Sequence, residues 1–222
     1  MSPVLLLFIE ILVLFFLSRK TSMVLSQGLY RVFHHEKIVV FLVALLFLPG
    51  VIVHELSHYL VATLLFVKTG KIEFMPVVRG DSVKLGSVEV SHTDPLRKFL
   101  IGIAPIVVGL VLLFASFYYL TTAYLPISPW IQFVLLGIIA FELSNTMFSS
   151  RKDMEGVLPL LVVFVLATVG GLFFGANIIA EAIRLLDKSV SPSMIIFYVQ
   201  VLLLPLGIDM GLILLVKLLF RP

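Results

Sequence analysis

The sequence predicts an all-α polytopic membrane protein of about six transmembrane helices, with a small membrane-surface β-hairpin between the second and the third. Of the 222 residues, 60% are hydrophobic and only 13% are charged, whereas soluble domains are about 45–50% apolar and about 25% charged. One polar stretch, residues 68–98, interrupts the apolar pattern and alternates as a strand does. Six apolar stretches stand out: residues 3–17, 38–67, 99–120, 129–148, 157–180 and 194–216.

The first apolar stretch, residues 3–17, is shorter than the others and contains Glu10. A secretory signal carries basic residues before its apolar run. Here no Lys or Arg precedes the run, and Arg19 and Lys20 follow it. We therefore expect residues 1–37 to form a retained N-terminal transmembrane helix followed by an interfacial segment.

The second stretch, residues 38–67, is too long for a straight span and holds Pro49 and Gly50 near its middle. Proline lacks a backbone donor and bends a helix axis. We expect one kinked helix, and a re-entrant hairpin is the alternative.

The polar stretch between the second and third apolar runs has the alternation of a β-hairpin. Polar and apolar side chains alternate along residues 71–75 and 83–85, and along residues 88–90 in the shifted phase. Residues 79–82 have the composition of a turn. We expect this hairpin to lie at the membrane surface.

The remaining stretches have ordinary spanning lengths, and the last two are expected to form a C-terminal pair of transmembrane helices within residues 157–222. With six spans and the N-terminus inside, most of the 16 Lys and Arg residues fall on the inner side. The net charge of +3 then reflects helix ends beside a lipid bilayer, and nucleic-acid binding is not expected. The chain has no cysteine, which excludes disulfides and thiolate metal sites.

The most specific chemical signal is residues 54–58, which read His-Glu-Leu-Ser-His within the second apolar stretch. Four residues are just over one helical turn, so the imidazoles of His54 and His58 project from one face and can hold one zinc ion. Glu55 is placed to act as general base on the metal-bound water. Three ionisable residues in one turn of a membrane helix are costly, which favours a functional site.

Catalytic zinc usually has three protein ligands and one water. The residues leave several candidates for the third ligand. Asp153 follows the fourth apolar stretch and Glu142 lies inside it, and His92 and Glu155 are further candidates.

This pattern resembles the site-2 protease family of intramembrane zinc metalloproteases. The H-E-x-x-H motif lies in a membrane helix, a β-hairpin loop follows, and Asp153 comes eight residues after Asn145. The family's second motif is N-x-x-P-x-x-x-x-D-G, in which the Asp is the third zinc ligand. This chain keeps the spacing but has Phe148 at the proline position and Met154 after the Asp. The resemblance covers residues 38–156.

The resemblance implies an intramembrane zinc metalloendopeptidase with residues 38–156 as its catalytic core. It implies Zn²⁺ as cofactor, His54, His58 and Asp153 as ligands, Glu55 as the catalytic residue and Asn145 beside the metal, where it holds the substrate backbone. Its partner would be a transmembrane protein substrate, cut near the cytoplasmic side. The chain would then be a multi-pass protein of a prokaryotic cell membrane, of undetermined oligomeric state.

The hairpin and the substrate are connected in this interpretation. A substrate helix must unwind before cleavage, and an exposed strand edge can receive the extended segment by β-addition. A simple connecting loop is the alternative role for residues 68–98.

Two other functions remain as alternative hypotheses. A membrane zinc protease of the prenyl-protein-processing type would use Glu142 in place of Asp153. A metal transporter or an inactive scaffold would bind metal without catalysis, but the intact Glu55 argues against a scaffold. Asp209, in the last apolar stretch, is either a helix-interface residue or part of a water path.

Overall fold

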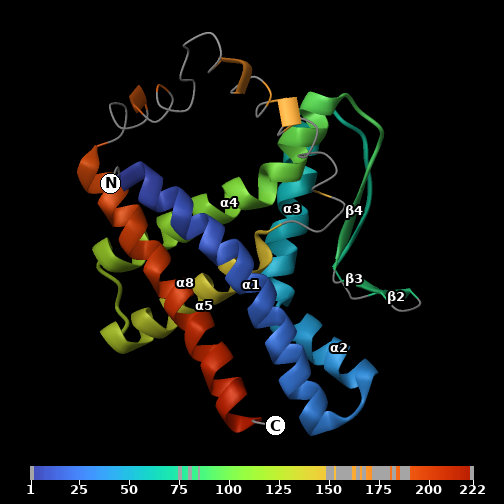
Figure 1. The fold of residues 1–222 in the computed structure, drawn as a ribbon, viewed down its shortest axis with the longest axis vertical. Coiled ribbons are helices and arrows are strands. Elements are labelled where there is room, and N and C mark those ends of the chain that lie inside the picture. Colours follow the sequence, from blue (N-terminus) through green and yellow to red (C-terminus); the bar gives the residue numbers. More distant parts are fainter. Residues whose placement is uncertain are drawn as a thin grey trace.

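The computed structural model describes residues 3–74, 77–79, 82–84, 86–148, 153, 162–163, 166, 169–171, 181, 184–185 and 191–220. The predicted fifth span, residues 157–180, and Glu155 therefore lie largely or wholly outside the described residues. The protein is mostly helical (Figure 1), with the following helices: α1 (Pro3–Phe33), α2 (Glu36–Leu46), α3 (Leu48–Leu64), α4 (Pro95–Thr122), α5 (Pro129–Thr146) and α8 (Pro192–Leu219).

Helices α4 and α5 begin where the sequence supplies a cap followed by proline. The Asp94 carboxylate accepts a hydrogen bond from the backbone N–H of Arg97 at 3.0 Å, and Pro95 opens α4. Ser128 caps α5 in the same way, with Pro129 at the first helical position. Proline suits this position because its missing N–H has no partner there in any helix.

The predicted kink in the second apolar stretch is present. Helices α2 and α3 meet at Phe47 with a bend of 67°. Pro49 lies in the first turn of α3, where its missing N–H would have no partner within that helix. A side chain on Gly50 would come within 2.7 Å of the Glu142 carbonyl oxygen. Glycine therefore allows α3 to lie directly against α5.

Among the described residues, three helices are long and apolar enough to cross a membrane: α4, α5 and α8. The count rises to four if the bent pair of α2 and α3 forms one span. Large apolar side chains are exposed along these helices, for example Phe133 at 58% and Leu218 at 60%. Lipid is the solvent that such surfaces require, so the chain is a membrane protein.

Helix α1 lies beside α8, and the two run in the same direction (Figure 1). Thr21 neighbours Asp209, a side chain on Gly28 would meet Val216, and Arg31 donates a hydrogen bond to the Phe220 carbonyl. Six alternating spans would set the first and last helices antiparallel. The described helices therefore do not confirm the six-span arrangement.

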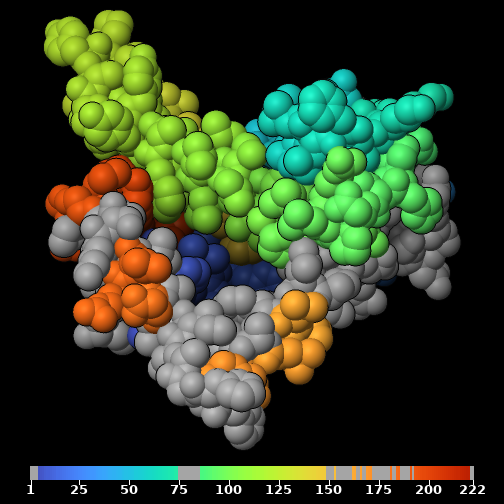
Figure 2. Space-filling view, turned by 90° about the horizontal axis from the view of Figure 1, so that it is seen from above, coloured from blue at the N-terminus to red at the C-terminus, as the bar shows by residue number. Residues whose placement is uncertain are grey.

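One apolar core joins the helices of all three predicted segments of the chain. It includes Leu14 of α1, Leu113 of α4, Leu143 of α5 and Leu202 of α8. Seen from above, α4 forms a long ridge, and α1 is visible in a hollow beside it (Figure 2).

The polar stretch forms the predicted β-hairpin. Strand β1 (Thr69–Glu73) pairs antiparallel with β4 (Ser87–Val90), and β2 (Val77–Arg79) pairs antiparallel with β3 (Ser82–Lys84). In this hairpin β1 and β4 run beside α3, and the end with β2 and β3 projects from the helices (Figure 1). Strand β1 covers residues 71–73 of the strand predicted over residues 71–75 and begins earlier, at Thr69, whereas Met75 lies outside the described residues. The tip of the predicted turn, residues 80–81, lies outside the described residues. Both β1 and β4 contact α3, which carries the H-E-x-x-H motif.

Candidate metal centre

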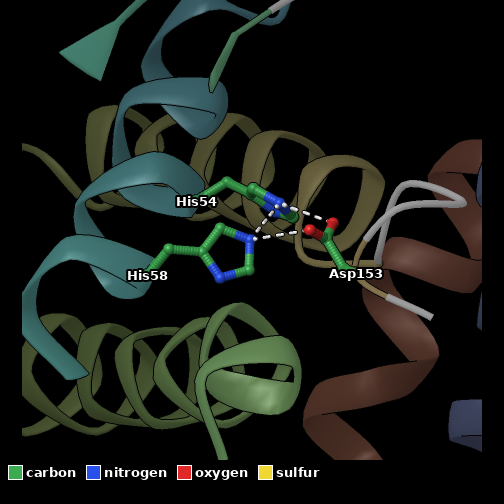
Figure 3. A group of neighbouring side chains, drawn as sticks. All are labelled: His54, His58 and Asp153. Carbon is green, nitrogen blue, oxygen red and sulfur yellow. Dashed lines mark hydrogen bonds and ion pairs between the residues drawn. The ribbon is translucent and has the colours of Figure 1, made fainter. Parts of the chain in front are cut away.

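Two imidazoles and one carboxylate converge at the middle of the helical assembly. His54 and His58 project from one face of α3 toward Asp153 (Figure 3). The two Nε2 atoms are 3.2 Å apart. Asp153 places one oxygen 3.6 Å from His54 Nε2 and the other 3.4 Å from His58 Nε2. Their side chains are only 11%, 7% and 16% exposed, respectively, for His54, His58 and Asp153. Water therefore screens the electrostatic interactions among the three side chains only weakly.

The tautomers of both histidines follow from their hydrogen bonds. His54 Nδ1 lies 2.7 Å from the carbonyl oxygen of Thr146, and His58 Nδ1 lies 2.8 Å from that of Ile101. A carbonyl oxygen can only accept, so each Nδ1 carries the proton. In the neutral rings each Nε2 then presents a lone pair, and both lone pairs face the other ring and the Asp153 carboxylate. A metal ligand with its second ring nitrogen bonded to a carbonyl is the usual arrangement of histidine metal sites.

Among the described residues, neither carbonyl has a helical N–H as its partner, so both are available to the imidazoles. Ile101 lies four residues before Pro105, which has no N–H to donate to it within α4. Thr146 is the last residue of α5, where carbonyls have no intrahelical donor. A proline inside one helix and the end of another thus supply the two acceptors that orient the imidazoles.

The spacing of the three ligand groups fits a metal ion. In a tetrahedral site with bonds of about 2.0–2.1 Å, neighbouring ligand atoms are about 3.3 Å apart. The 3.2 Å between the two Nε2 atoms lies close to this value, and each Nε2 has one oxygen of Asp153 at 3.4–3.6 Å, a different oxygen for each ring. Lone pairs from two nitrogens and a carboxylate repel one another unless a cation lies between them. The group can therefore hold a metal ion, and three protein ligands leave the fourth position for a water or a substrate, as catalytic sites do.

Glu55 stands beside this group and is not one of the three ligands. It follows His54 on α3, is buried, and lines the same cavity. Gly86, immediately before β4, passes close to it: a side chain at this position would come within 3.0 Å of a Glu55 carboxylate oxygen and 2.8 Å of Val51. Glycine therefore lets the β-hairpin approach the carboxylate directly.

The three groups and Glu55 open into a cavity of about 770 Å³. Strand β4 lines it with Ser87 and Val88, and α1 lines it with Ser18 and Ser22. Asn145 of α5 also lines it. The cavity is larger than a single side chain and reaches both the hairpin and the helices.

The structure separates the candidates for the third ligand. Asp153 joins the two histidines, and among the described residues theirs is the one group of three that can hold a metal. Glu142 is occupied elsewhere, because its carboxylate accepts the Gly50 N–H at 3.1 Å. His92 lines the cavity but does not belong to the group.

Several groups that shape the site have no signal in the motifs. The groups of Ile101 and Thr146 that orient the imidazoles are backbone carbonyls, which no side-chain motif marks. Asp209 of α8 accepts a hydrogen bond from Asn145 at 2.9 Å. A buried acid in an apolar stretch was visible in the sequence, but its partner on another helix was not.

Comparisons with protein-family models, with curated proteins and with solved structures find no match to this chain.

Proposed function

We propose that this protein is an intramembrane zinc metalloendopeptidase that hydrolyses peptide bonds in or near the transmembrane segments of other membrane proteins. One observation carries the proposal. The Nε2 atoms of His54 and His58 and the carboxylate of Asp153 converge within 4.8 Å, next to the buried Glu55 and in a cavity among apolar helices. A metal, a general base and an enclosed reaction space are what peptide hydrolysis by a metalloprotease requires.

Zinc is the ion that the ligand set favours. Two imidazoles and one carboxylate are the ligand types of hydrolytic zinc sites, and their spacing is compatible with a tetrahedron. When bound, zinc supplies a Lewis acid that polarises the scissile carbonyl and lowers the pKa of water toward about 7.

In this proposal Glu55 moves the protons. Hydrolysis adds water across the peptide C–N bond, so one proton must leave the attacking water and one must reach the departing amine. The Glu55 carboxylate accepts the first and delivers it to the amine nitrogen. Burial keeps this carboxylate close to the reacting atoms and away from bulk water.

The substrate is proposed to bind as an extended strand along β4. Strand β4 pairs with β1 on one side, and its residues line the cavity beside Glu55. Backbone pairing would hold a substrate whose helix has unwound, and Gly86 keeps the approach narrow. Asn145, in the wall of the cavity, is proposed to bond the substrate backbone.

The membrane setting follows from the same helices. We propose a multi-pass protein of a prokaryotic cell membrane, similar in its motifs to the site-2 protease family. The prenyl-protein-processing alternative is disfavoured because Glu142 bonds to Gly50 and is not among the three converging groups.

Proteolysis in reconstituted vesicles tests the proposal. Purified protein is mixed in liposomes with a panel of single-span substrates that carry tags at both ends, and products are identified by mass spectrometry. Wild type should cut one or more substrates within or next to the span, and a zinc chelator should stop the reaction. Glu55→Gln should reduce the rate by about 10²–10⁴-fold while the chain keeps its zinc. Zinc binding with no cleavage of any substrate would favour a non-catalytic metal-binding protein.

A further inference from the structure

Asp209 is an unusual residue for a packed membrane helix. It lies in the middle of α8 and is fully buried. One carboxylate oxygen accepts a hydrogen bond from Asn145 Nδ2 at 2.9 Å. The other oxygen has no hydrogen bond of acceptable geometry among the described residues, although the Thr21 side chain of α1 lies beside the carboxyl group. Burying a carboxyl group with so few partners is costly, and a helix interface alone is more stable with apolar side chains.

The partner of Asp209 lies in the turn that orients a predicted metal ligand. Asn145 is the neighbour of Thr146, whose carbonyl oxygen accepts the His54 Nδ1 hydrogen at 2.7 Å. The Asn145 amide nitrogen also contacts the Phe141 carbonyl at 3.0 Å. A movement of this turn would therefore move the acceptor that sets the His54 ring.

The last turn of α5 is held from two sides. On the α3 side, Gly50 N–H donates to the Glu142 carboxylate at 3.1 Å. On the α8 side, the only hydrogen bond that joins this turn to α8 among the described residues is the one between Asn145 and Asp209. Helix ends fray because their carbonyls lack intrahelical donors. A bond from a neighbouring helix is the direct way to keep such a turn fixed.

We propose that Asp209 is a positioning residue for the metal centre. Through Asn145 it fixes the last turn of α5 and so holds the Thr146 carbonyl against His54. Asp209 touches neither the metal ligands nor the substrate, and α8 thereby acts on the site from outside it. The inference rests on the metal centre of the proposed function, but it does not require that the protein cut peptides.

The expected effect is on metal affinity. Groups that bond directly to a metal-ligating histidine typically change affinity by about 10–100-fold when they are lost. Asp209 acts one residue further away, so we expect Asp209→Ala to weaken zinc binding by about 3–10-fold, the low end of that range or below it. Asp209→Asn retains an oxygen that can accept from Asn145, so it should stay close to wild type.

A matched control separates this effect from general loosening of the helices. Glu10 is also a buried carboxyl in α1, next to α8, with an unpartnered oxygen. No hydrogen bond joins it to α5 among the described residues. Glu10→Ala therefore removes a comparable group without touching the link to Thr146.

The experiment measures zinc affinity of the full-length chain in detergent, by competition with a chromophoric chelator, for wild type, Asp209→Ala, Asp209→Asn and Glu10→Ala. The visible absorption spectrum of the Co²⁺-loaded proteins reports the ligand geometry. The proposal predicts weaker zinc binding and a shifted cobalt spectrum in Asp209→Ala alone.

Three results would overturn the proposal. Unchanged affinity and spectrum in Asp209→Ala would do so, and so would an equal loss in Glu10→Ala or in Asp209→Asn. Wild type that binds neither ion would instead refute the metal centre itself, and with it the proposed function.

Discussion

Replacing Pro105 by alanine should change the stability of the fold and the affinity for zinc in opposite directions. A proline with a structural role alone would change both in the same direction. Pro105 is buried inside α4, four residues after Ile101. Its ring removes the N–H that would bond to the Ile101 carbonyl, and that carbonyl accepts the His58 Nδ1 hydrogen at 2.8 Å. Alanine restores the donor, so the helix and the histidine then share one acceptor.

The substitution should raise the unfolding free energy and lower the affinity for zinc. Proline inside a helix costs up to about 3 kcal/mol, although membrane helices tolerate it better, so Pro105→Ala should raise the unfolding free energy by about 1–3 kcal/mol. Loss of a hydrogen bond behind a metal-ligating histidine costs about 10–100-fold in affinity. Because a carbonyl oxygen has two lone pairs, we expect the lower limit, about tenfold or about 1.4 kcal/mol.

Two assays on the same preparation measure both quantities. Unfolding is followed in mixed micelles with increasing denaturing detergent, and zinc affinity is followed by chelator competition. Gly137→Ala is the control, since a side chain there meets nothing within 4 Å. It should stabilise α5 by up to about 1 kcal/mol and leave zinc affinity unchanged. Unchanged zinc affinity in Pro105→Ala would refute the role of the freed carbonyl, and so would a fall in both quantities.

Three further predictions concern close approach and capping. Gly86→Ala should lower the rate of peptide hydrolysis without loss of zinc, because its side chain would press on Glu55; equal rates would contradict this contact. Gly50→Ala places a methyl group 2.7 Å from a backbone carbonyl of α5. The overpacking cost of about 1–3 kcal/mol outweighs a helix gain of about 1 kcal/mol, so the thermal midpoint should fall. The hydrogen bond from the Arg97 backbone lowers the pKa of Asp94, so its cap stabilises the fold above the unfolded pKa of about 3.9 and weakens as pH falls through the folded value. Asp94→Asn should flatten that part of a stability-against-pH curve.

The sequence was most informative where one segment determines its own structure. The kink near Pro49 depends on local backbone chemistry, and the bend between α2 and α3 agrees with it. The spacing of His54 and His58 along one helix predicted that they lie on the same face, and the structure confirms it. The hairpin followed from strand alternation between two apolar runs.

The arrangement of helices depends on contacts that no local pattern encodes. Hydropathy identifies apolar segments but not their direction or partners, so the parallel packing of α1 and α8 was not predicted. The choice between Asp153 and Glu142 was open for the same reason, since both lie near the end of α5 and only packing against α3 separates them. Backbone acceptors such as the Ile101 carbonyl are invisible in side-chain motifs.

Zinc content of the purified protein tests the central claim most directly. Elemental analysis compares wild type with His54→Ala, Asp153→Ala and Glu142→Ala. The proposed centre predicts about one zinc ion per chain in wild type and in Glu142→Ala, and loss of zinc in the other two variants. Zinc retained in Asp153→Ala, or no zinc in wild type after supplementation, would contradict it.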